Sequence, residues 1–333
     1  MEKKNVLVTG GAGFIGSFLC EAILREGHRV ICVDDISTGN LLNIDSLLRN
    51  PNFQFLKFNI NEPFQIESFG ELDPFKVKFV GIQEIYHLAM PTSVKNYEQF
   101  RMHAVLSNSV GMKNILDVAV KYKAKFLLAS SATVYGSHHG DGTIKEDALG
   151  TIDHLNPRGC FNEGKRFAET MTTTYNDVLG IDGKIARIFR TYGPRMPLFH
   201  GHQIPDFVLN VLDDTPIMIA GDEKSSTSLT YVTDVVDGLM RLMKTERGIG
   251  PVNIGNDADI VIADVAKKIM ELAGATVPIM YEAQPAHMIP LALPALQKAR
   301  EKLGWIPLVR LEDGLRKTLD YIRANKFLLT RGQ

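Results

Sequence analysis

Three glycines spaced three residues apart, Gly10, Gly13 and Gly16, follow a short apolar run at residues 5–8. An amphipathic stretch at 14–26 comes next, so the order is strand, glycine turn and helix. Gly10 permits a tight turn, Gly13 a close approach to a pyrophosphate, and Gly16 close packing of helix on strand. A helix N-terminus offers free N–H groups and a partial positive charge. The pattern therefore predicts a dinucleotide-binding site.

An acidic residue supports this interpretation. The next apolar run, 28–33, ends at Asp34. A carboxylate at this place accepts hydrogen bonds from an adenosine ribose and repels a 2′-phosphate. We therefore expect NAD, rather than NADP, as the cofactor.

The composition excludes several other classes. The chain has 333 residues, of which 45% are hydrophobic and 23% charged, and a formal net charge of −1. Without a long basic run, neither nucleic acid nor an anionic membrane is an expected partner. The three cysteines lack paired or metal-type spacing, so we expect no metal site and a reducing, cytoplasmic setting. No apolar run is long enough to span a bilayer, and the immediate start of a strand predicts no signal peptide.

Strand and helix patterns alternate along the first two thirds of the chain. Strands are predicted at 53–58, 84–89, 125–130 and 184–189, and helices at 41–48, 96–121 and 160–179. Residues 62–81 show no clear period and are interpreted as an insertion. Beyond residue 193 the helices are shorter, at 205–212, 233–244, 262–273 and 311–324. This predicts an α/β fold with a doubly wound parallel sheet.

The same pattern predicts two domains. We expect an NAD-binding domain at 1–190, to which part of the later chain returns, and a smaller α/β substrate lobe formed mainly by 191–333. Ligands of such sheets bind at the carboxyl ends of the strands, so the lobe should cover those ends.

Several motifs resemble the extended short-chain dehydrogenase/reductase family, and within it the nucleotide-sugar decarboxylase branch. They lie at residues 9–17, 87–89, 127–136, 156–171, 186–196 and 303–305. The resemblance implies a Rossmann-type fold, NAD as cofactor and a nucleotide-sugar substrate. It also implies cofactor contacts from Gly10, Gly13, Phe14, Ile15, Gly16, Asp34, Ser37, Thr38, Gly39, Asn59, Ile60, Leu88, Ala89, Ser107, Ala129, Lys165 and Thr191.

The catalytic helix departs from that family. The resemblance implies a tyrosine four residues before a lysine, which places both on one helix face. The lysine, here Lys165, binds the nicotinamide ribose and lowers the phenol pKa, so that the phenolate can take a proton from a sugar hydroxyl. In this chain the tyrosine position holds Phe161, which has no proton to exchange.

Substrate positions depart as well. Ser131 is retained and can donate to a substrate oxygen, whereas Thr133 stands where the family carries an acid. Arg190 replaces an asparagine, and His202 stands where decarboxylases often have arginine. Thr227 and the segment 289–295 replace positions whose arginines grip the nucleotide diphosphate. Pro91, Ser131 and Arg190 are the expected substrate contacts.

Other groups could replace the missing base. His202 is the best candidate among the histidines; His138, His139, His154 and His200 are expected at the surface. Tyr135 is a second candidate, although the family carries a packing tyrosine there. Cys160, beside Phe161, could serve as a nucleophile, although single cysteines are usually inert.

The apolar stripes at 105–120 and 167–178 predict a homodimer, because relatives pair these two helices across a two-fold axis. The predicted function is oxidation of a sugar hydroxyl, leading to dehydrogenation, epimerisation, dehydration or decarboxylation by an atypical site. A non-catalytic NAD-binding sensor or partner protein is an alternative. A third possibility is an NAD-dependent enzyme that acts on a non-nucleotide small molecule.

Overall fold

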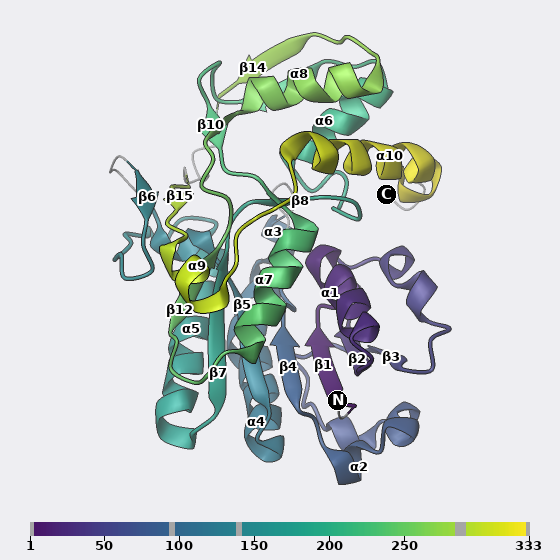
Figure 1. Ribbon diagram of the computed structural model, residues 1–333, viewed down its shortest axis with the longest axis vertical. Coiled ribbons are helices and arrows are strands. Elements are labelled where there is room, and N and C mark those ends of the chain that lie inside the picture. The colour runs from purple at the N-terminus through teal and green to yellow at the C-terminus, as the bar shows by residue number, and fades with distance from the viewer. Residues whose placement is uncertain (1–2, 93–96, 138–141, 284–290, 331–333) are drawn as a thin grey trace.

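The computed structural model describes residues 3–92, 97–137, 142–283 and 291–330. A seven-stranded sheet lies at its centre, in the order β12-β7-β5-β4-β1-β2-β3, with every neighbouring pair parallel (Figure 1). Its strands are β1 (Asn5–Thr9), β2 (Arg29–Asp34), β3 (Phe53–Lys57), β4 (Glu84–His87), β5 (Lys125–Ser131), β7 (Asp182–Ile188) and β12 (Pro251–Ile254). This is the doubly wound parallel sheet predicted from the sequence.

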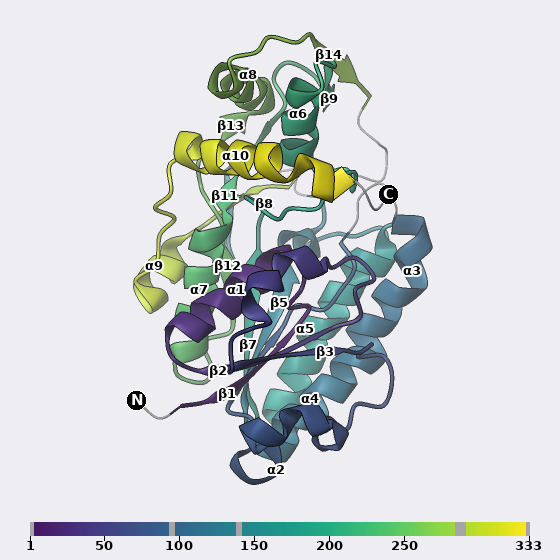
Figure 2. The same cartoon turned by 90° about the vertical axis from the view of Figure 1, so that its right-hand side faces the viewer.

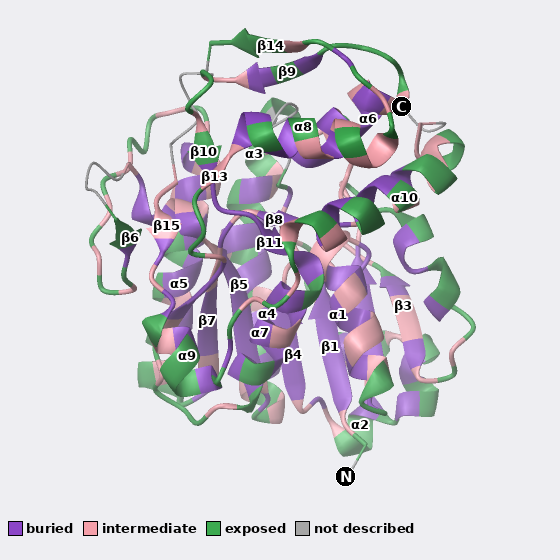
Figure 3. Ribbon diagram, turned by 45° about the horizontal axis from the view of Figure 1, so that its top comes forward, coloured by how far each residue is buried: buried purple, intermediate pink, exposed green. Residues whose placement is uncertain are grey.

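Helices cover both faces of the sheet, because its strands alternate between two apolar cores. Val6 and Val8 of β1 pack toward α1 (Phe14–Arg25), α7 (Val232–Lys244) and α9 (Gln297–Leu303). Leu7, between them, packs into the opposite core. That core is covered by α4 (Met112–Tyr122) and α5 (Gly159–Leu179). On the same side of the sheet, α3 (Tyr97–Leu106) packs against α5 (Figure 2). The strands are accordingly buried along most of their length (Figure 3).

A smaller lobe lies over the carboxyl ends of the strands (Figure 1). Its core is formed by α6 (Gln203–Leu212), α8 (Ile262–Ala273) and α10 (Leu311–Thr330). Short strand pairs complete this part of the chain: β8 (Thr191–Tyr192) with β11 (Thr230–Tyr231), β9 (Ile217–Ala220) with β14 (Ile279–Glu282), β10 (Ser226–Thr227) with β13 (Ile260–Val261), and β6 (Thr143–Ile144) with β15 (Leu293–Pro294).

Some expected elements differ in detail. The helix expected at 41–48 is two 3₁₀ turns, η1 (Leu41–Asn43) and η2 (Asp45–Leu47). The Asn43 side chain donates to the Ala12 carbonyl at 2.9 Å and joins the first turn to the glycine turn. The helix expected at 96–121 is interrupted by a π-helical turn, η5 (Ser107–Gly111). There the Asn108 amide donates to the Ala104 carbonyl at 2.8 Å. The helix expected at 160–179 is confirmed as α5.

The region expected to be an insertion carries short helical turns that lead into β4. They are η3 (Ile66–Ser68), η4 (Gly70–Phe75) and α2 (Val77–Val80); a further turn, η6 (Ala132–Tyr135), follows β5. The later chain contributes β12, α7 and α9 to the layers of the central sheet. Within the described ranges, no helix combines the length and apolar character needed to cross a membrane.

Candidate functional site

The glycine turn after β1 lies where the strand order reverses. From β1 the chain first builds the sheet toward β3, and it then returns to add β4 on the other side. Gly10 has φ of 72°, and a Cβ on it would lie 2.8 Å from the Ala89 nitrogen, just beyond β4. A Cβ on Gly16 would lie 2.1 Å from the Gly10 carbonyl oxygen. Backbone contacts therefore require glycine at both positions, and the N-terminus of α1 opens at a topological switch point.

A cavity of about 330 Å³ joins this turn to α5, which carries Phe161 and Lys165. Its lining contains most of the predicted cofactor residues: Gly10, Gly13, Phe14, Ile15, Gly16, Asp34, Ser37, Thr38, Gly39, Ile60, Leu88, Ala89, Ala129, Lys165 and Thr191. Of the predicted catalytic and substrate residues it contains Pro91, Ser131, Thr133, Phe161, Arg190 and His202. The fold thus brings together residues that are far apart in the sequence.

Asp34 ends β2 at the cofactor end of the cavity. Its carboxylate accepts from the Ala12 N–H at 3.0 Å and the Ile36 N–H at 2.9 Å. Burial raises the pKa of this carboxyl, while these backbone hydrogen bonds oppose the shift. A Cβ on Gly39 would lie 2.8 Å from Oδ1, so the following turn folds closely against the acid.

Lys165 lies at the other end, on the cavity face of α5. Its ammonium donates to the Ala129 carbonyl at 2.7 Å, and the residue is 6% exposed. Burial lowers its pKa to about 8, against the opposing effect of Glu169. Among the described residues this carbonyl is its only acceptor, so two N–H bonds remain for a ligand. Together with the glycine cradle and Asp34, this arrangement fits a dinucleotide, with Lys165 available to its nicotinamide ribose.

Ser131 and Thr133 lie where β5 turns into η6. The Ser131 hydroxyl accepts from the Thr133 N–H at 3.3 Å and the Thr133 hydroxyl at 3.1 Å. Its own proton therefore remains available to a substrate oxygen. Phe161 lies one helical turn before Lys165, and the Arg158 guanidinium lies 5.4 Å from the centre of its ring.

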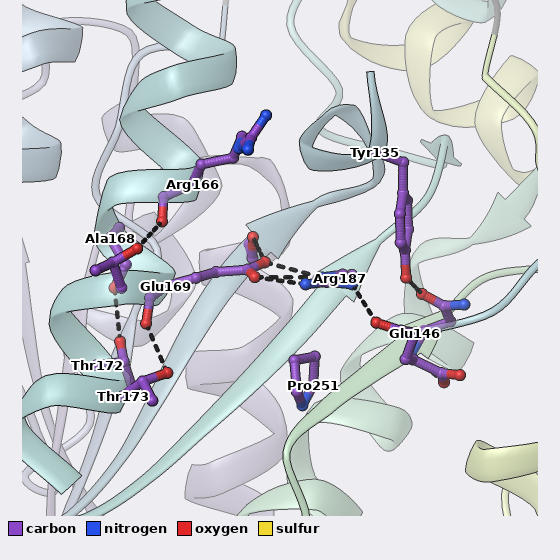
Figure 4. Close-up of polar contacts among 12 residues, drawn as sticks. Tyr135, Glu146, Arg166, Ala168, Glu169, Thr172, Thr173, Arg187 and Pro251 are labelled. Atoms are coloured by element: carbon purple, nitrogen blue, oxygen red, sulfur yellow. Dashed lines mark hydrogen bonds and ion pairs between the residues drawn. The ribbon is translucent and has the colours of Figure 1, made fainter. Parts of the chain in front are cut away.

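A buried polar network lies behind these residues (Figure 4). Glu169 of α5 accepts from the Ser130 hydroxyl at 2.6 Å and from Arg187 Nη2 at 2.7 Å. Arg187 also donates to the Glu146 carbonyl at 2.8 Å. Because Ser130 and Arg187 belong to β5 and β7, the network fixes α5 against both strands.

Tyr135 belongs to this network and does not line the cavity. Its hydroxyl donates to Asn253 Oδ1 at 2.6 Å, and the Arg187 guanidinium lies 4.7 Å from its ring centre. Burial raises its pKa to about 12. A phenol in this environment keeps its proton at neutral pH, and Tyr135 does not reach the part of the cavity that Ser131 and Phe161 line.

Two predicted cofactor residues also lie outside the lining. The Asn59 side chain accepts from the Asn61 N–H at 3.0 Å. Ser107 is 1% exposed, and its hydroxyl has no partner among the described residues.

Cys160 is half-buried and its thiol donates to the Pro157 carbonyl. His138, His139 and residues 289–290 fall outside the described ranges.

Arg158, His200 and His103 also line the cavity, although none of them was expected there from the sequence. Arg158 lies three residues before Phe161, and that spacing on a helix start was an available signal. His200 was expected at the surface, but it lines the cavity. At the cofactor end, His103 Nε2 of α3 lies 3.3 Å from Asp35 Oδ2. The sequence could not show this contact, because it depends on how α3 packs. In the described parts of the chain, no group of three or more His, Cys, Asp or Glu residues could hold a metal ion.

Comparisons with known proteins agree with this geometry. Residues 6–255 match the NAD dependent epimerase/dehydratase family. The chain is 34% identical over 322 residues to UDP-glucuronic acid decarboxylase 1 of Xenopus tropicalis, covering 97% of this chain and 73% of that protein. It is 36% identical over 311 residues to UDP-glucuronic acid decarboxylase 4 of Arabidopsis thaliana, covering 93% and 67%.

A solved structure gives the same result. The crystal structure of UDP-glucuronic acid 4-epimerase from Bacillus cereus, in complex with UDP-glucuronic acid and NAD, superimposes with a TM-score of 0.82. The two chains are 28% identical, and the match covers 96% of this chain and 99% of the epimerase. The chain therefore belongs to the NAD-dependent epimerase/dehydratase family and is an NAD-dependent enzyme of that type.

Proposed function

We propose that the chain oxidises a hydroxyl group of a nucleotide sugar at an active site that works without the tyrosine expected from the family resemblance. The observation that carries this proposal is the cavity. It joins the glycine turn and Asp34 to Lys165, Phe161 and Ser131. The relatives support the substrate class, because their names refer to UDP-glucuronic acid.

Each residue has a definite task in this proposal. NAD, when bound, supplies the hydride acceptor. Lys165 donates to the nicotinamide ribose, and Ser131 donates to the reacting oxygen of the substrate. Because Phe161 has no exchangeable proton, the hydroxyl proton leaves to solvent water as the hydride is transferred. Dehydrogenation, epimerisation, dehydration and decarboxylation all share this oxidation step.

The test is a spectroscopic assay of the NAD-loaded protein with UDP-, GDP-, CDP- and dTDP-sugars. The near-ultraviolet absorbance of a reduced nicotinamide should appear with at least one of them, either transiently or in steady state. Lys165→Met should abolish that signal, whereas Lys113→Met, an exposed lysine on α4, should leave it unchanged. No absorbance change and no product with any sugar nucleotide would contradict the proposal.

We also propose a homodimer formed through α3, α5 and the turn between α3 and α4. Apolar side chains are exposed on these elements: Met102 is 69% exposed, Phe167 50% and Val178 73%. Helices of a neighbouring subunit would cover these apolar side chains.

Light scattering at micromolar concentration should give twice the mass of the chain. Phe167→Glu should shift the protein to the monomer, because it places a charge in the apolar interface. Phe79→Glu is the matched control, since Phe79 is 89% exposed on α2, away from these helices. A monomeric parent protein would refute the assembly.

A further inference from the structure

Charge is distributed unevenly along the cavity. Among the described lining residues, the acids are Asp34 and Asp35, both at the cofactor end. The reacting end carries two arginines and two histidines beside Phe161, namely Arg158, Arg190, His200 and His202. Such a distribution gives one end of a cavity a positive potential.

The two arginines lie close enough to act on each other. Arg190 follows β7, and its Nη1 donates to the amide oxygen of Gln203 at 3.0 Å. Burial, and then the neighbouring charge of Arg158, lower the pKa of Arg190. A neutral amide oxygen does not offset the cost of burying a charged guanidinium. An anion that binds beside Arg190 therefore gains more binding free energy than one that binds beside an exposed arginine.

His202 precedes α6 and faces the same charges. Burial lowers its pKa to about 4, followed in size by the effects of His200, Arg190 and Arg158. Asp206, one turn along α6, opposes the lowering of the pKa of His200. Thus His202 is neutral at pH 7 as long as no anion lies between it and the arginines. A weakly basic imidazole of this kind is also a poor acceptor for an alcohol proton.

We propose that Arg158, Arg190 and His202 form an anion subsite that holds a phosphate or carboxylate group of the substrate, and that His202 takes up a proton when the anion binds. The proposal rests on the proposed function and names the part of its substrate that this end recognises. It gives His202 the task of an anion ligand in place of a general base. Arginine can meet the anion through two parallel N–H bonds, and protonated imidazole adds a third charged donor.

The first experiment measures binding to the NAD-loaded protein by calorimetry. The probes are UDP, UDP-glucose and UDP-glucuronate, and the variants are Arg158→Gln and Arg190→Gln. Each variant should weaken binding by about 10- to 100-fold, because it leaves a buried anion short of a charged donor. Arg166→Gln is the matched control, since Arg166 lies on α5 and donates to the Gly150 carbonyl, outside the lining.

The three probes distinguish the two sources of the anion. An equal loss for all three assigns the subsite to the diphosphate. A loss confined to UDP-glucuronate assigns it to a carboxylate on the sugar. Binding of all three probes by both variants as tightly as by Arg166→Gln would overturn the proposal. Thermal unfolding of each variant confirms that it is folded, and the two arginines provide independent tests.

The second experiment measures the proton. UDP-glucuronate has no group that titrates near neutrality, so calorimetry in buffers of different ionisation enthalpy reports protons taken up by the protein. The parent should take up protons on binding at about pH 6 and bind more tightly there than at about pH 8. The sign follows from the His202 pKa, which is about 4 in the free protein and rises when a negative charge lies beside the ring. His202→Gln should reduce both effects, and proton uptake equal to that of the parent would overturn the assignment to His202.

Inorganic pyrophosphate separates this proposal from the proposed function. Titrated into the NAD-loaded protein, it tests the subsite without any sugar nucleotide. Binding that is lost in Arg190→Gln supports the subsite even if every sugar nucleotide fails in the oxidation assay. Equal binding by the parent and Arg190→Gln, with normal oxidation of a sugar, would remove the subsite and leave the proposed function standing.

Discussion

The two ends of the cavity are built in different ways. The cofactor end is made mainly of backbone: Gly10 and Gly16 are fixed by contacts with main-chain atoms, and Asp34 is held by two N–H groups. The reacting end is made of side chains from separate segments, including Ser131, Phe161 and Arg190. Backbone geometry tolerates few substitutions, whereas side chains on a rigid frame can be exchanged singly. The cofactor end therefore keeps a general task, and the reacting end can change its substrate.

The largest effect is expected at Gly16. A Cβ there would lie 2.1 Å from the Gly10 carbonyl oxygen, so Gly16→Ala forces helix and strand apart at a cost of about 3 kcal/mol or more. NAD binding measured by calorimetry should be lost. Gly70→Ala is the control, because a Cβ at Gly70 meets nothing within 4 Å. An NAD affinity that is unchanged in Gly16→Ala would contradict the view that backbone contacts fix the cofactor end.

The next effect concerns Lys165, at the boundary between the ends. Its pKa is about 8 in the folded chain against an ordinary value of 10.5, so its charge opposes folding by up to about 3 kcal/mol below pH 8. Between these two values the unfolded chain holds more protons, so the stability of the parent rises with pH through this window. Lys165→Met should raise stability at neutral pH by about 2 kcal/mol, after loss of the hydrogen bond to Ala129. It should also lose NAD binding.

Chemical denaturation at several pH values checks this prediction. The advantage of Lys165→Met should be largest below pH 8 and should shrink toward pH 10.5. Lys113→Met, on the exposed surface of α4, should differ from the parent by less than about 0.5 kcal/mol at every pH. A variant less stable than the parent at neutral pH would show that the buried charge is compensated.

A smaller effect is expected at Asp34. Asp34→Ala removes the acceptor for a ribose hydroxyl and the charge that repels a 2′-phosphate, each worth about 1–3 kcal/mol. The two losses act on the ratio in the same direction, so the ratio of NAD to NADP affinity should fall by about 30-fold or more. The ratio is the proper measure, because the freed Ala12 N–H weakens both cofactors alike. Asp45→Ala, in η2, should leave it unchanged, and equal affinities in the parent would refute the NAD preference.

The same contrast explains what could be predicted from the sequence. The strand, the glycine spacing and Asp34 are local signals set by steric requirements, and they predicted the cofactor end and the sheet. The π-helical turn at Ser107–Gly111 was missed, because one extra residue per turn hardly changes an apolar period. His200 was assigned to the surface and Tyr135 was a candidate base, because burial depends on the packing of distant segments. No local sequence pattern shows that the Arg187 guanidinium would lie over the Tyr135 ring, outside the cavity lining.

The smallest effect is expected from Phe161→Tyr, which tests the reacting end directly. The change adds one oxygen on the face that carries Lys165, and a general base is typically worth about 10²–10⁴ in rate. If only the base were missing, the variant should gain that factor with UDP-glucuronate. We expect no gain, because the surroundings of residue 161 also differ from the family resemblance: Arg190 and His202 line the cavity, and Thr227 is buried in β10, outside the lining. Steady-state assays of parent and variant on one panel of sugar nucleotides decide the matter, with Phe79→Tyr, an exposed ring on α2, as the control. A large gain in rate with UDP-glucuronate would show that this site is the family site with only its general base removed. In a site whose other residues fit a different substrate, the restored phenol would not increase the rate.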